Sequence, residues 1–159
     1  LPAFNDPEVI KLFESTGVLS PVELASRYEV YSEQYVLSIE VEAKLVVELA
    51  STAVYPAAVN YLSQLASTSQ GLSAMGVSLD SSVAASVASE SNAMMGAVAK
   101  LSDALSKHDF DSTDAHMQFL ATDVRGLMDE VRSHADTLEG LVPDELWPMA
   151  KYREMLFIK

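Results

Sequence analysis

The longest run of patterned apolar positions lies between residues 20 and 66, where apolar side chains return every three or four residues. The positions on this face are Leu24, Tyr28, Tyr31, Tyr35, Ile39, Val46, Leu49, Ala53, Ala57, Tyr61 and Leu65. This spacing is typical of one face of a helix. Ser20, Pro21 and Glu23 provide an N-cap, a proline at the first helical position and the glutamate of a capping box. We predict one helix over 20–66, roughly 70 Å long at about 1.5 Å per residue, as the spine of the molecule.

Pro56 lies inside this predicted helix. A proline there removes one backbone hydrogen bond and clashes with the preceding turn. Because the apolar period continues beyond it, we expect a bend near residues 52–56 and not a break.

Weaker patterns predict the other elements. Two more long helices are expected over 81–107 and 112–139, the second with the clearest heptad spacing. Their inward positions are Val83, Val87, Met94, Val98, Leu101 and Leu105, and then Met117, Leu120, Val124, Leu127, Val131, Ala135 and Leu138. A short helix over 6–16 ends at Gly17, and the Ser- and Gly-rich residues 67–82 read as a mobile linker.

The predicted fold class is all-α: one domain, residues 1–159, forming an elongated antiparallel bundle of three long helices with short terminal helices. Gly140 is expected to cap the third long helix. The tail, 141–159, holds Trp147, Tyr152 and Phe157, an aromatic density that predicts docking on another surface.

Charge and composition narrow the functions. The net charge of −13 argues against binding nucleic acid or an anionic membrane surface. No apolar run approaches the ~18 residues of a membrane span. The absence of cysteine excludes disulfides and thiolate metal sites and fits a reducing compartment. A chain that begins Leu1-Pro2, without an initiator Met, is expected to be a piece of a longer protein.

No catalytic, cofactor or metal residues are assigned. Glu40 and Glu42 point about 200° apart on a helix and cannot chelate one ion. Glu130 and His134 lack the Glu-x-x-His spacing and the partner motif of a di-metal bundle, which argues against a ferritin-like metalloenzyme. His108 and His116 are expected at ordinary surface positions. Nucleotide-binding and nucleophile motifs are missing. The assigned candidates are instead interface residues, namely Phe13, Tyr28, Tyr31, Tyr35, Trp147, Tyr152, Leu156 and Phe157.

Both ends of the chain resemble the C-terminal region of type III glutamine synthetases. The N-terminal blocks are Lys11–Glu14, Gly17-Val18, Glu23–Tyr31, Ile39–Ala43 and Tyr55–Ala58, and the C-terminal blocks are Arg132–Leu138 and Leu146–Phe157. The last block is similar to the family's Trp-Pro-x-Pro-x-Tyr-x-x-Leu-Leu-Phe ending. Ala150 and Arg153 depart from the expected proline and glycine. Gly126 stands where the family often has proline, which predicts a straighter helix there.

The resemblance implies a parent enzyme that joins ammonia to glutamate with ATP and Mg or Mn, as a cytoplasmic homo-oligomer. The catalytic residues would lie upstream of Leu1, so this piece alone is expected to have no enzymatic activity. Its partner would be the catalytic domain of the same chain, and its role structural, assembly or regulatory docking. The alternative is a free-standing helical sensor or protein-interaction module, which gives no reason for the tail Trp147–Phe157. In the isolated chain we expect that tail to be partly exposed, paired with a neighbouring copy or disordered.

Overall fold

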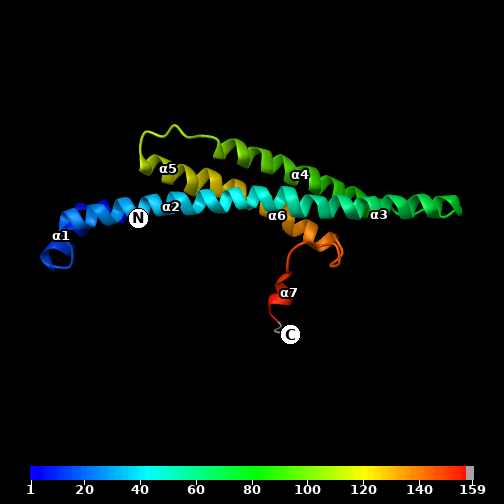
Figure 1. Cartoon of the computed structure of the whole chain (residues 1–159), viewed down its shortest axis with the longest axis horizontal. Coiled ribbons are helices and arrows are strands. Elements are labelled where there is room, and N and C mark those ends of the chain that lie inside the picture. The colour runs from blue at the N-terminus through cyan, green and yellow to red at the C-terminus, as the bar shows by residue number, and fades with distance from the viewer. Residues whose placement is uncertain (157–159) are drawn as a thin grey trace.

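The computed structural model describes residues 1–156, without the side chains of Tyr152 and Arg153; residues 157–159 lie outside this description. The described part is all-α and contains no strand, which confirms the predicted fold class at that level. Figure 1 shows long helical rods lying side by side, the first of them the longest, with the chain turning back between successive rods. The short helices and the tail lie at the ends of these rods.

The first rod is continuous from Pro21 to Ala74. It consists of α2 (Pro21–Leu49), the π-helical turn η2 (Ala50–Val54) and α3 (Tyr55–Ala74). The start follows the predicted capping box: the Ser20 hydroxyl accepts from the Glu23 N–H, and the Glu23 carboxylate accepts from the Ser20 N–H at 2.8 Å. By length and composition alone this rod passes as a membrane span, but so does the core helix of many soluble proteins.

Both π turns stand two residues before a residue that disturbs helix geometry. In η2 the Tyr55 N–H donates to the Ala50 carbonyl, five residues back, and Pro56 follows. The wider turn gives the proline ring room against the preceding carbonyl, so the rod passes Pro56 without a break. A second π turn, η3 (Leu120–Val124), precedes Gly126 in the same way. The π turn is thus present without the proline, and the expectation of a straighter helix at Gly126 stays a prediction.

The core lies where the second rod meets the third. The second rod is α4 (Ser82–Leu105); the third consists of α5 (Thr113–Phe119), η3 and α6 (Arg125–Leu141). The contact between α4 and α6 is the most extensive in the molecule. The buried side chains of this seam are Val87, Met94, Ala97, Val98, Leu101, Leu120, Val124, Val131 and Leu138. On the first rod, Ala43, Ala50, Val54 and Ala58 join the same cluster, and their small size allows the helices to approach closely.

Not every predicted inward position faces the core. Tyr31 and Leu49 on the first rod and Val83 at the start of α4 are exposed. The periodicity places Tyr31 and Leu49 at the edge of the buried face, where the burial depends on which helix lies alongside.

Residues next to the helix ends determine where α1 and α6 begin or stop. The 3-10 turn η1 (Pro2–Asn5) leads into α1 (Pro7–Ser15), which is capped by the Asp6 carboxylate. Gly17 follows α1 with φ +68°, the left-handed conformation that favours glycine. At the other end, α6 runs through Gly140 and stops at Leu141, because Val142 precedes Pro143 and is extended. The predicted glycine cap at 140 is wrong.

The predicted linker over 67–82 is wrong for its first half. Residues 67–74 continue α3, and only 75–81 connect it to α4, with Gly76 at φ +80°. Ser and Gly are weak helix formers, but here they prolong an established helix, which costs less than starting one.

We expect this tip to open first in solution. Among residues 66–74 only Leu72 is even half-buried, and α6 reaches α2, η2 and α4 whereas α3 packs mainly on α4. Amides over 67–81 should therefore exchange faster than those over 124–138, where Val124, Val131 and Leu138 are buried. Equal protection of the two segments in a hydrogen-exchange experiment would contradict this.

Candidate docking surfaces

The three tyrosines of α2 face different surroundings. The Tyr28 hydroxyl donates to the Asp114 carboxylate at 2.5 Å and so links α2 to α5. Tyr35 is half-buried against the core cluster. Tyr31 is exposed, and its ring meets Phe4 edge-on at 6.2 Å between centroids. Tyr28 and Tyr35 thus help to hold the rods together, whereas Tyr31 is exposed; the interface role of all three stays a prediction.

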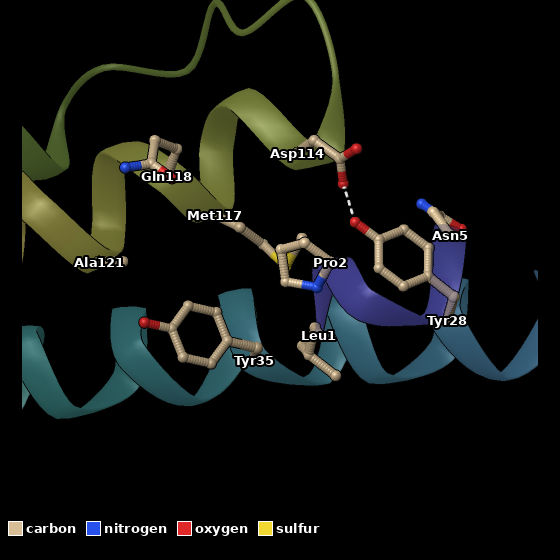
Figure 2. Close-up of a pocket in the computed structure, with 9 residues that line it drawn as sticks. All are labelled: Leu1, Pro2, Asn5, Tyr28, Tyr35, Asp114, Met117, Gln118 and Ala121. Atoms are coloured by element: carbon tan, nitrogen blue, oxygen red, sulfur yellow. Dashed lines mark hydrogen bonds between the residues drawn. The ribbon is translucent and has the colours of Figure 1, made fainter. Parts of the chain in front are cut away.

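Figure 2 shows a pocket between the start of the first rod, η1 and the start of the third rod. Its volume is about 480 Å³. The lining residues are Leu1, Pro2, Asn5, Tyr28, Tyr35, Asp114, Met117, Gln118 and Ala121. The walls are mainly apolar, with polar groups at the amides of Asn5 and Gln118, the Tyr35 hydroxyl and the Tyr28–Asp114 pair.

The bond between Tyr28 and Asp114 predicts an alkaline loss of stability. The hydrogen bond to the carboxylate, helped by burial and by the charge of Asp114, raises the pKa of Tyr28 above its ordinary value of 10.0. A pKa raised on folding stabilises the protein below the unfolded pKa, and the contribution disappears as pH rises through the folded pKa. Tyr28→Phe should cost about 1 kcal/mol at pH 7, and its difference from the unmodified chain should shrink above pH 10. Urea unfolding at several pH values tests this, with Tyr31→Phe as the control; a difference independent of pH would contradict it.

The tail begins as part of the core and not as a free docking segment. Trp147 is only 8% exposed and belongs to the core cluster with Leu138 and Val142. Lys151 fixes the turn: its Nζ donates to the Glu139 carbonyl at 3.1 Å and forms an ion pair with Asp144. The tail was expected to be partly exposed, paired with a copy or disordered; this is wrong for Trp147, whereas Met149, Met155 and Leu156 are exposed.

Beyond Lys151 the tail leaves the rods. The short helix α7 (Tyr152–Met155) projects away from them (Figure 1), and Leu156 is 68% exposed. Phe13, on α1 beside the start of the first rod, is half-buried. The predicted interface side chains of Tyr152 and Phe157 lie outside the described residues.

A second apolar surface is formed by residues that are not among the predicted interface residues. Four large apolar side chains lie along the outer side of α2, opposite its buried face; this outer stripe consists of Val30, Leu37, Val41 and Leu45. Leu37 is 63% exposed. The steps of seven, four and four residues place the stripe on one helix face. The signal was present in the sequence as a second apolar period, one that the stronger inward period concealed.

The ionisable side chains that were weighed as metal ligands serve instead as links between helices. His134 Nδ1 lies 2.8 Å from Glu90, and Glu130 pairs with Lys100 at 2.8 Å, so both join α6 to α4. His116 is not an ordinary surface residue: it is half-buried, stacked on Phe110 at 4.2 Å and 3.4 Å from Glu40. Among the residues that the structure describes, no three His, Asp or Glu side chains gather into a metal-binding group.

The fold therefore defines a helical domain with packed rods and with exposed apolar side chains on its surface. Comparison with known proteins identifies the family of this domain. Residues 1–73 match the family model described as "Glutamine synthetase C-terminal domain". The chain belongs to the family of glutamine synthetase C-terminal domains, and the resemblance noted in its sequence is confirmed.

Three curated relatives carry the comparison further. The chain is 35% identical over its whole length to the type-3 glutamine synthetase of Dictyostelium discoideum, of which it covers 23%. It is 26% identical over 89% of its length to a glutamine synthetase of Bacteroides fragilis, covering 21% of that protein. A glutamine synthetase of Butyrivibrio fibrisolvens is 29% identical over 99% of this chain, which covers 23% of it. The chain thus spans less than a quarter of the length of these relatives.

Proposed function

We propose that this chain is the C-terminal helical extension of a type III glutamine synthetase and that it has a structural, assembly or regulatory-docking role. The parent enzyme would ligate ammonia to glutamate with ATP and Mg or Mn, as a cytoplasmic homo-oligomer. The observation that carries this is the similarity over the whole chain to under a quarter of a type-3 glutamine synthetase. The rods would act together as an elongated antiparallel bundle, and no residue of this chain would take part in the chemistry.

The outer stripe supports a docking role, because contiguous apolar side chains on a surface mark a contact with another protein surface. We propose that the catalytic domain of the same chain covers the outer stripe and the end of the tail. Neither nucleic acid nor a membrane is proposed as a partner, since the net charge of −13 repels both phosphates and anionic lipids. The alternative of a free-standing sensor module lacks support, because all three relatives are much longer chains.

The double substitution Leu37→Ser with Val41→Ser tests the docking role. Both residues are exposed, so we expect a change within about 0.5 kcal/mol in the unfolding free energy of this chain alone. In the complete synthetase the same change removes apolar contact, and should lower the melting temperature or the size of the oligomer.

The matched control is Val22→Ser, an exposed valine of the same helix outside the outer stripe. It should leave both proteins unchanged. A complete synthetase that keeps its melting temperature and oligomer size with the double substitution would contradict the proposed docking surface. Melting curves and size-exclusion chromatography on this chain and on the complete synthetase give the measurement.

A further inference from the structure

The pocket of Figure 2 lies where any preceding polypeptide must leave the domain. Leu1 and Pro2 line it on one side, and Met117, Gln118 and Ala121 of the third rod line it on another. The chain covers 21–23% of its curated relatives and matches a C-terminal domain, so a protein of their length would continue upstream of Leu1, beside this pocket. We infer that the segment directly upstream of Leu1 fills the pocket. This inference rests on the proposed function.

The lining suits an extended peptide. Met117, Ala121 and the ring of Tyr35 offer an apolar floor, and the primary amides of Asn5 and Gln118 each provide donors and an acceptor for a peptide backbone. A cavity of 480 Å³ is on the order of 8 Å across, and three extended residues span about 10 Å. About three upstream residues therefore match the pocket, with an apolar side chain placed on its floor.

The pocket also lies between two rods that are in contact at this end. Tyr28 and Asp114 provide a polar link between α2 and α5. A segment inserted beside this link would contact both rods. The upstream connection would thus dock rigidly against the domain, and would not be a free tether.

Cysteine labelling tests this directly, because the chain has no cysteine of its own. In the complete synthetase, Ala121→Cys places a thiol in the pocket. Ala115→Cys is the control, an exposed alanine of α5 outside the lining. Reaction with a maleimide, read for each peptide by mass spectrometry, should be about tenfold or more slower at position 121, because labelling there requires local opening.

A second variant ties the protection to the upstream segment. Replacing the three residues that precede Leu1 with glycine should restore labelling at position 121 and leave position 115 unchanged. Equal rates at the two positions before that replacement, or protection that persists after it, would overturn the inference. The proposed function would survive such a result, because its own test concerns Leu37 and Val41 on another face.

Discussion

Replacing Trp147 with alanine is expected to lower the free energy of unfolding of this chain by about 3 to 5 kcal/mol. The indole is 8% exposed and packs in the same cluster as Leu138 and Val142. Truncation to alanine removes the buried surface of the indole and leaves a cavity at the C-terminal end of α6. The turn around it is held by Lys151 and the Glu139 carbonyl, so it cannot readily collapse into that cavity.

The control for this experiment is Met149→Ala, two residues along the same tail. Met149 is exposed, and its truncation should change the unfolding free energy by less than about 0.5 kcal/mol. Urea unfolding followed by far-UV circular dichroism gives both values without relying on the tryptophan signal. Equal effects of the two substitutions would show that Trp147 does not belong to the core.

Leu101→Ala should cost about 2 to 5 kcal/mol. Leu101 is completely buried in the seam between α4 and the third rod, where neighbouring side chains on rigid helices cannot move far into the space left behind. Leu37→Ala removes the same atoms from an exposed position and should change the stability of this chain by no more than about 0.5 kcal/mol. Denaturant unfolding of both variants compares them. If the two leucines cost the same, α4 does not face the third rod as described.

The parts of the fold predicted from sequence are those governed by local signals. The capping box at Ser20 and Glu23, the left-handed Gly17 and the heptad positions Val124, Val131 and Leu138 all depend on neighbours within one or two turns. They lie in the structure where the pattern placed them.

Other features depend on which helix packs against a residue, and the spacing of apolar residues along the chain does not contain that information. Tyr31 has the same spacing as Tyr28 and Tyr35, yet no rod covers it. Trp147 looked like a docking residue because its tail is short and aromatic; its burial follows from the turn at Pro143 folding back on α6. Residues 67–74 are weak helix formers by composition, but α3 before them carries the helix onward.

The candidate site was predicted only in part. Tyr31 and Leu156 are among the predicted interface residues and both are exposed, while their contact with a partner stays a prediction. The outer stripe was not predicted because α2 carries apolar residues on two faces. In the sequence the two sets of positions overlap, and the second set obscures the spacing of the first. Its most exposed member, Leu37, falls between Tyr35 and Ile39 and was attributed to neither face.

The two π turns have a consequence for how this protein tolerates insertions and deletions. Each π turn holds one residue more than the α-helical spacing requires and takes up that residue within its wider turn. Deleting one residue within Ala50–Val54 would restore α spacing and leave Ala57 and Ala58 facing the core. Deleting a residue within α2 would instead turn the helix on one side of the deletion by about 100° relative to the other. A residue added or lost in the loops at 75–81 or 106–112 rotates no helix. A one-residue deletion should therefore be accepted in those loops and at the π turns, and rejected inside the α-helical parts of the rods.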